Sequence, residues 1–356
     1  MKVGIIGLPQ SGKKTLFQVL TGSPVAEQGG QAKPVPGTAD IIDERFDKLV
    51  ALYEPKKETR ARIDLALLPK IEQETIAKGD IFQHIVDVDA LCHVIRAFED
   101  ESVYHVSGSV DPQRDLEMVN AELLMHDQLF VEKRIERLET NLKKIKDDKQ
   151  QQELELMQRI QAHLDQEHPL RLMSFSEDED LLIRSYPFIT RKEMILVFNV
   201  AEDKLDDITI LERAAAACAA DKMEAMLVSA RVEAEIAELE REEEKQEFLA
   251  DLGIAEPALG VLTRLCLAAL GRMSFFTVGK DEVHQWLVRL NSAAPVAAGA
   301  IHSDLQKGFI RAEVIKYDEL MEHGSETELK KRGKVYVHGK DYIVEEGDII
   351  NIRFNV

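Results

Sequence analysis

The chain has 356 residues, a length that corresponds to two or three average domains. Its 45% hydrophobic and 31% charged residues, with 19 glycines and 11 prolines, exclude collagen-like, mucin-like and wholly disordered proteins. The formal net charge of −20 would repel a polyphosphate backbone, so we expect nucleic acid to bind only at local basic patches.

Cysteine usage and hydropathy indicate the compartment. Cys92, Cys218 and Cys266 are odd in number, far apart and without CxxC spacing, which is typical of a reducing cytoplasm. No segment approaches the ~18 apolar residues of a membrane span, and the apolar run near the start is too short for a signal peptide. We therefore expect a cytoplasmic protein without a membrane partner. We also expect a monomer.

The first residues predict a strand, a glycine-bounded loop and a helix. Residues 2–6 have the character of a buried strand, and the apolar spacing of residues 15–20 suits a helix. Further strand-like runs cover residues 63–68, 91–96, 194–198 and 226–228. Continuous apolar strands that alternate with helices favour an α/β fold with a mostly parallel sheet covered on both faces.

A polar, glycine-free stretch interrupts this pattern between residues 112 and 169. Two sets of apolar residues recur in it at helical spacing: Val131, Ile135, Leu138, Leu142 and Ile145, then Leu154, Met157, Ile160 and Leu164. They predict an antiparallel, coiled-coil-like helical hairpin, which either packs as a charged surface element or protrudes as an arm that docks a large partner. Ser176 and Glu179 then form a capping-box pattern for a short helix.

The pattern of predicted elements changes after Arg272. Short strand-like runs cover residues 275–278, 309–314, 335–337 and 349–354, which predicts a small mixed sheet, and Trp286 is expected in the core on a helix after Asp281. Residues 273–356 hold 11 Lys and Arg against 13 Asp and Glu, a net charge of −2, so −18 of the total −20 lies on residues 1–272.

Residues 7–13, GLPQSGK, fit the first seven positions of a P-loop, in which backbone N–H groups and a helix N-terminus bind phosphates. The same residues could form a merely structural glycine turn. The eighth position should carry a Ser or Thr hydroxyl for Mg²⁺, but Lys14 occupies it, and an ammonium cannot ligate a cation. Thr15 is rotated by roughly 100° around the helix and is an unsuitable replacement. The candidate phosphate-binding residues are Gln10, Ser11, Gly12, Lys13, Lys14 and Thr15, and no metal ligand is predicted.

Motifs along nearly the whole chain resemble those of the YchF or Obg-like ATPase branch of the P-loop GTPases. They are residues 7–9, 12–13, 96–99, 105–108, 110–112, 232–234, 236–239, 298–299, 301–304, 307–312, 339–344, 347–348 and 354–356. The resemblance implies a P-loop NTPase sheet, an inserted helical hairpin and a C-terminal β-grasp-like TGS domain. The implied boundaries are 1–112 with 176–272 for the nucleotide-binding domain, 113–175 for the arm and 273–356 for the TGS domain.

The resemblance also implies base-binding residues. Asn199 to Glu202 match the NxxE variant of the guanine-reading NKxD motif, which is associated with accepting ATP at least as well as GTP. Val200 would contact the purine, and Ser229 with Ala230 would line the base from the other side. Outside this family context, Asn199 and Glu202 could be ordinary loop capping groups.

The phosphate side departs from the family pattern. Gln10 replaces an Asn, Lys14 replaces the Mg²⁺-binding Ser, and the DxxG turn appears as residues 64–67, DLAL. Residues 69–75 lack the glycines of the following switch, and residues 31–38 offer no confident switch threonine. We therefore expect purine nucleotide binding with doubtful Mg²⁺ dependence and weak or absent hydrolysis, with Lys14 supplying the positive charge.

Two alternatives remain open at this point. An active ATPase or GTPase switch would need Asp64 to hold the metal through water, whereas a non-catalytic module would only bind ribosome or RNA; no catalytic residue is assigned. The resemblance implies ribosome or RNA contact through the TGS domain and the arm. The candidate RNA contacts are Lys330, Lys331 and Arg332, which could equally form a solubilising turn.

Overall fold

The computed structural model describes residues 2–25, 33–71, 80–214, 223–239, 241–254 and 256–355. Contacts divide the chain into two compact units, one of residues 1–37 and 64–258 and the other of residues 38–63 and 259–356. The second unit thus takes a segment from the N-terminal part of the chain. The three-domain boundaries expected from the sequence stay a prediction.

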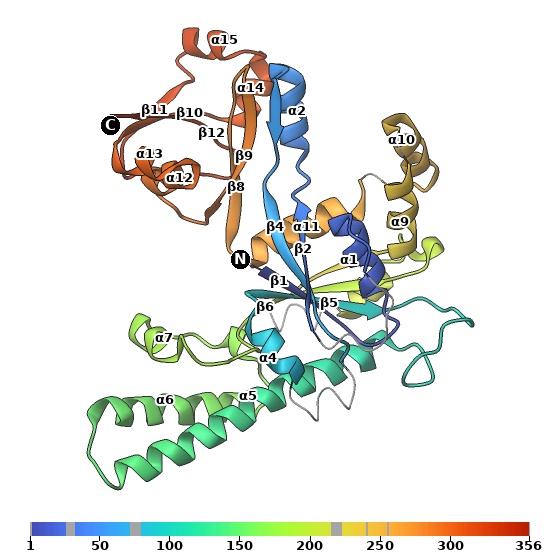
Figure 1. Ribbon diagram of the computed structural model, residues 1–356, viewed down its shortest axis with the longest axis vertical. Coiled ribbons are helices and arrows are strands. Elements are labelled where there is room, and N and C mark those ends of the chain that lie inside the picture. Colours follow the sequence, from blue (N-terminus) through green and yellow to red (C-terminus); the bar gives the residue numbers. More distant parts are fainter. Residues whose placement is uncertain are drawn as a thin grey trace. The chain divides into compact units, whose positions relative to one another are not determined.

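A six-stranded sheet organises the first unit, in the order β2-β4-β1-β5-β6-β7. Each neighbouring pair from β4 to β7 is parallel, as expected for continuous apolar strands that helices cover on both faces. In Figure 1, α1 and α9 lie on one side of this sheet and α4 and α5 on the other. The strands are β1 (Lys2–Ile6), β2 (Val35–Asp40), β4 (Arg62–Leu67), β5 (Ala90–Arg96), β6 (Glu193–Asn199) and β7 (Glu224–Val228).

Several helices of the first unit begin at a polar capping residue and have apolar residues at helical spacing. Ser176 and Glu179 form the predicted capping box at the start of α7, each satisfying a backbone N–H of the other residue. The helical elements are α1 (Lys13–Thr21), α4 (Asp80–Val86), α5 (Pro112–Leu142), α6 (Asp148–Leu164), η1 (Leu170–Leu172), α7 (Glu177–Ile183), η2 (Glu202–Lys204), α9 (Ala230–Glu238) and α10 (Glu242–Asp251).

Helices α5 and α6 form the predicted antiparallel hairpin, called the arm below (Figure 1). At the root of the arm, the buried Asp115 carboxylate lies 2.9 Å from His105 Nε2 and from Arg114 Nη2. Farther along, Glu153 accepts hydrogen bonds from Arg134 across the two helices. One detail of the prediction was wrong: Ile145 was expected on the apolar seam, but α5 ends before it, and the side chain is 73% exposed in the turn.

The second unit contains a mixed six-stranded sheet in the order β11-β10-β12-β8-β9-β3. The β12–β8 and β3–β9 pairs are parallel, whereas the β10–β11, β10–β12 and β8–β9 pairs are antiparallel. Residues of α12 pack in one apolar core of this unit, and residues of α2, α14 and α15 pack in another. The elements are α2 (Glu44–Tyr53), β3 (Lys57–Thr59), α11 (Ala258–Ala269), β8 (Arg272–Thr277), β9 (Glu282–Arg289), α12 (Ala294–Ile301), α13 (Ser303–Lys307), β10 (Phe309–Ile315), α14 (Tyr317–His323), α15 (Glu326–Lys331), β11 (Tyr336–His338) and β12 (Ile349–Phe354).

The predicted fold class is confirmed, with one local correction in the second unit. Trp286 lies on strand β9 and not on a helix, because residues 282–289 alternate between more and less buried positions and pair with β8 on one side and β3 on the other. None of the helices in the described part of the chain combines the length and apolar character needed to cross a bilayer.

Candidate nucleotide-binding site

The P-loop sequence forms a tight turn between β1 and α1. Gly12 adopts a left-handed conformation, with φ of 89°, and a Cβ atom there would lie 2.1 Å from Asn199 Nδ2. A side chain at Gly7 would meet the Val94 carbonyl oxygen at 2.4 Å. Both positions therefore need glycine because other parts of the chain approach them closely. The loop leads into the N-terminus of α1, whose first N–H groups have no partner within the helix and favour an anion.

Asn199 joins the P-loop to the loop expected to hold the base. Its Nδ2 donates to the Ser11 carbonyl at 3.0 Å, and its Oδ1 accepts from the Ala230 backbone N–H at 2.9 Å. The side chain is buried, so both hydrogen bonds are protected from water. Three segments that lie far apart in the sequence thus meet at one place: Ser11 with Gly12, Asn199, and Ala230.

The other candidate base-binding residues lie directly after the ends of β6 and β7 or close to them. The Val200 N–H donates to the Val228 carbonyl at 2.8 Å, and Ser229 caps α9 by accepting from the Val232 N–H at 3.5 Å. Glu202 begins η2 and is exposed. Val200 is only 2% exposed, so its side chain packs in the interior in this conformation.

Lys13 and His93 form a buried pair below the loop. Lys13 Nζ donates to the carbonyl oxygens of Gly7 at 2.9 Å and Leu8 at 3.1 Å. His93, on β5, is fully buried; burial and then the charge of Lys13 lower its pKa to about 3. The imidazole is therefore neutral at ordinary pH beside a charged ammonium. Sequence reasoning passed over His93 because a single histidine within an apolar strand has no motif around it.

The side chains at the metal position do not fit Mg²⁺. Lys14 lies in the first turn of α1, where a hydroxyl ligand would be needed, and its ammonium has no lone pair for a cation. Among the described residues, no group of three or more His, Cys, Asp or Glu side chains could hold a metal ion.

Asp64, the candidate switch residue, does not lie at the P-loop. It pairs in register with Lys2, at the start of β1, whereas the P-loop begins after Ile6. Five residues of extended strand separate Lys2 from Gly7, about 16 Å at 3.3 Å per residue. The residues beside the P-loop end of β1 are instead Leu67, the last residue of β4, which lies opposite Ile5, and Leu68 directly after it, whose N–H donates to the Ile5 carbonyl at 3.0 Å. The sheet register therefore removes the geometric basis for a metal held by Asp64.

Several sequence predictions lie outside the described residues. They are residues 72–75 of the altered switch, residues 31–32 of the segment searched for a switch threonine, and Cys218. Gln10 is exposed in the P-loop with φ of 62°, and Thr15 is half-buried on α1.

The predicted basic cluster of the second unit lies at the end of α15 and is internally paired. Lys330 lies 3.7 Å from Glu326, and Lys331 and Arg332 lie 3.5 Å and 3.2 Å from Glu328. Carboxylates one helical turn away thus neutralise much of the positive charge, although such exposed pairs are weak.

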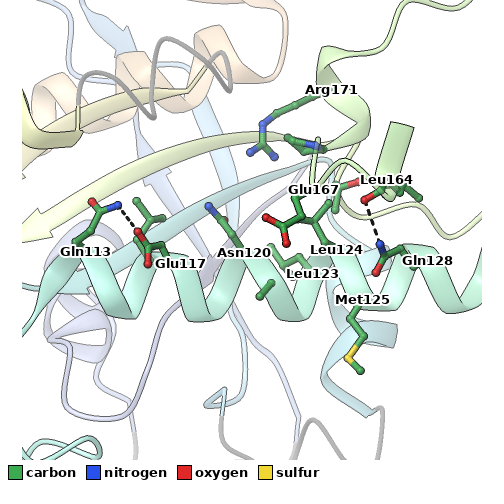
Figure 2. Close-up of a pocket in the computed structure, with 14 residues that line it drawn as sticks. Gln113, Glu117, Asn120, Leu123, Leu124, Met125, Gln128, Leu164, Glu167 and Arg171 are labelled. Carbon is green, nitrogen blue, oxygen red and sulfur yellow. Dashed lines mark hydrogen bonds between the residues drawn. The ribbon is translucent and has the colours of Figure 1, made fainter. Parts of the chain in front are cut away.

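A separate cavity of about 660 Å³ lies at the root of the arm, beside α5 and the end of α6 (Figure 2). Gln128 Nε2 donates to the Leu164 carbonyl at 3.1 Å there, and Gln113 donates to Glu117 at 2.7 Å. None of the predicted phosphate- or base-binding residues lines this cavity. The candidate nucleotide site is therefore the P-loop region and not this hollow.

Comparisons with known proteins agree with this fold and show the family. The family model YchF-GTPase_C, described as a protein of unknown function (DUF933), matches residues 273–355. The chain is 38% identical to the ribosome-binding ATPase YchF of Bacillus subtilis (strain 168), over 100% of both proteins. It is 36% identical to Obg-like ATPase 1 of Oryza sativa subsp. japonica, covering 100% of this chain and 92% of that protein. The solved structure of the Schizosaccharomyces pombe YchF GTPase matches with a TM-score of 0.82 and 28% identity, over 99% of this chain and 97% of that one. The predicted resemblance is thereby confirmed: the chain belongs to the YchF, or Obg-like ATPase, family.

Proposed function

We propose that this protein binds a purine nucleotide, ATP and also GTP, at the P-loop and associates with the ribosome in a nucleotide-linked manner. The observation that carries the proposal is the Asn199 bridge, which holds the P-loop and the base loop together through Ser11 and Ala230. Ribosome association and ATP rest on the full-length similarity to proteins named ribosome-binding ATPase YchF. Glu202, in the NxxE motif, supports ATP beside GTP.

We propose that this member of the family is divergent and hydrolyses nucleotide slowly or not at all. Phosphoryl transfer needs stabilisation of the developing charge, usually by a metal and fixed donors. Lys14 replaces the metal-binding hydroxyl, and Leu67 at the end of β4 and Leu68 after it lie where a DxxG turn would be expected. Lys14 supplies a fixed positive charge in place of the ion. No catalytic residue is assigned.

An active ATPase or GTPase switch is the second candidate, because the relatives with 38% and 36% identity are named ATPases. A single-turnover hydrolysis assay separates the two candidates. The main proposal expects the bound nucleotide to stay largely intact in the time in which a relative hydrolyses its own bound nucleotide, and the second expects hydrolysis that Lys13→Ala abolishes.

The proposed partner surfaces are the TGS-like second unit and the arm, on a monomer that works beside the ribosome in the cytoplasm. Co-sedimentation of the full chain with ribosomes, with and without ATP, tests the association. Sedimentation that ATP changes supports the proposal. Sedimentation that ATP leaves unchanged supports a non-catalytic ribosome- or RNA-binding module, and absence from the ribosomal fraction in both states contradicts association.

A further inference from the structure

The turn of the arm carries an unusual concentration of positive charge for this protein. Residues 141–150, called the arm tip below, contain four lysines and two aspartates, a net charge of +2 on a chain whose total is −20. The four lysines, at positions 143, 144, 146 and 149, are all exposed. Ile145 lies among them and is 73% exposed.

Hydrogen bonds fix the backbone of the arm tip. The Ile145 N–H donates to the Asn141 carbonyl at 3.0 Å and continues the end of α5. Asp147 caps α6 by accepting from the N–H groups of Lys149 at 2.9 Å and Gln150 at 3.2 Å. Because one of the two aspartates is engaged in this cap, the lysines project from an ordered turn and not from a loose loop.

The lysine side chains of the arm tip are available to a partner. No ion pair joins any of the four to a carboxylate in the described part of the chain, in contrast to Lys330, Lys331 and Arg332 on α15. A ligand would therefore not have to break an internal pair in order to use them.

The arm also separates these charges from the acidic remainder of its unit. Leu123 is the last α5 residue in the apolar core of the sheet, and Lys143 follows 20 residues later. At 1.5 Å per residue this is about 30 Å, more than three times the Debye length of about 8 Å at physiological ionic strength. A polyanion at the arm tip is thus screened from the carboxylates around the sheet. The net charge of −20 therefore does not prevent a polyanion from binding there.

We propose that the arm tip binds the phosphate backbone of folded RNA through Lys143, Lys144, Lys146 and Lys149. The inference rests on the proposed function, because it names a surface through which the protein contacts the ribosome. Separate, flexible ammonium groups suit phosphates that carry no sequence information. An anionic membrane fits less well, because surface-binding helices bury a broad apolar face and the arm tip offers only Ile145 to a bilayer.

The test compares two charge-matched variants of the full chain. The arm-tip variant changes Lys143, Lys144, Lys146 and Lys149 to Gln, and the control changes four exposed arginines of the first unit, away from the arm tip, to Gln: Arg159, Arg184, Arg213 and Arg241. Binding to a labelled, protein-free RNA hairpin with a stem of about 16 base pairs is followed by anisotropy between about 50 and 200 mM salt. Ribosome co-sedimentation is measured in parallel.

We expect the arm-tip variant to bind the hairpin at least about tenfold more weakly at the lower salt concentration. The slope of log K against log salt should fall by about one for each lysine that contacts a phosphate. The control should retain wild-type values, and Ile145→Ser should change affinity little. Equal affinity and slope in the arm-tip variant and the wild type, an equal loss in the control, or loss of binding to phosphatidylserine vesicles but not to RNA would overturn the inference.

The experiment distinguishes failure of the inference from failure of the proposed function. If the wild type binds the hairpin through the arm tip but never sediments with ribosomes, the inference stands and ribosome association fails. If the wild type and the arm-tip variant sediment equally and show the same salt dependence, ribosome association stands and the inference fails. ATP binding should be the same in all variants, because none of the substituted residues belongs to the candidate nucleotide site.

Discussion

The two sides of the nucleotide site differ in how far they preserve a working arrangement. On the base side, Asn199 joins the P-loop and the loop at Ala230 through two buried hydrogen bonds. A displacement of either loop would break them. On the phosphate side, Lys14 replaces the metal ligand and Leu67 with Leu68 lies beside the P-loop end of β1. We therefore propose that selection of the nucleotide and chemistry on it depend on separate parts of the chain, and that only the base side keeps its usual groups.

The largest expected effect comes from disrupting the base-side junction with Gly12→Ala. The added Cβ would lie 2.1 Å from Asn199 Nδ2, so either the P-loop or Asn199 must move. We expect ATP affinity to fall by at least about 100-fold, near 3 kcal/mol, measured by isothermal titration.

Gly22→Ala is the matched control for that prediction. Gly22 also has a positive φ, 61°, but nothing lies within 4 Å of its Cβ position. The Gly22→Ala variant should therefore lose only about 1 kcal/mol of folding free energy from backbone strain and should keep its ATP affinity. Equal losses of affinity in the two variants would show that strain, and not the Asn199 junction, matters.

The second prediction concerns the buried residues Lys13 and His93 beside the P-loop. Folded His93 has a pKa of about 3, whereas an unfolded histidine titrates near 6.5, so the unfolded state binds more protons between these values. Stability from His93 is complete above pH 6.5 and is lost as the pH falls, by about 2 kcal/mol at pH 5.

Urea unfolding of the wild type and His93→Leu at pH 8 and pH 5 measures this loss. The wild type should lose about 2 kcal/mol more than the variant between the two pH values, and His302→Ala, an exposed control, should behave as the wild type. An identical pH dependence in His93→Leu would mean that the imidazole is not kept neutral beside Lys13.

Lys14→Ser should partly restore the phosphate side. A hydroxyl at this position is a ligand that Mg²⁺ accepts, so ATP affinity in Mg²⁺ should exceed that in EDTA by about tenfold, near 1.4 kcal/mol. Titration of Lys14→Ala, which lacks both the charge and the hydroxyl, should show weak binding in both conditions. If Lys14→Ala binds as tightly as the wild type, the lysine does not supply charge to the nucleotide.

The smallest effect is expected from Thr15→Val. Thr15 is one residue beyond the metal position and rotated about 100° around α1, so removal of its hydroxyl should change ATP affinity by less than about threefold. A tenfold loss that appears only in Mg²⁺ would identify Thr15 as a metal ligand and weaken the contrast between the two sides.

Local signals predicted much of the fold. The strand at residues 2–6, the glycine loop, the capping box at Ser176 and the helical hairpin all depend on neighbouring residues, and the structure has each of them. Strand β2, with the sequence VPGTAD, escaped notice because proline and glycine conceal its strand character. The packing of Phe46 and Leu49 with Phe276 in the second unit is a contact between residues far apart in sequence, and no periodicity reports it.

The site shows the same limit. The P-loop glycines and Asn199 could be found from motifs, but the place of Asp64 depends on the register of β4 against β1, which a one-dimensional pattern does not contain. His93 required the three-dimensional proximity of Lys13. The basic run on α15 is a third example. The run is visible in the sequence, whereas its ion pairs with Glu326 and Glu328 can be seen only in the folded helix.

The most direct test of the account is the equilibrium affinity for ATP in Mg²⁺ and in EDTA, measured on the wild-type chain. With Lys14 in the metal position, the two dissociation constants should agree within about threefold, less than 1 kcal/mol. A loss of more than about tenfold in EDTA would contradict the account, because it would show that a metal ion, and not Lys14, completes the phosphate side of the site.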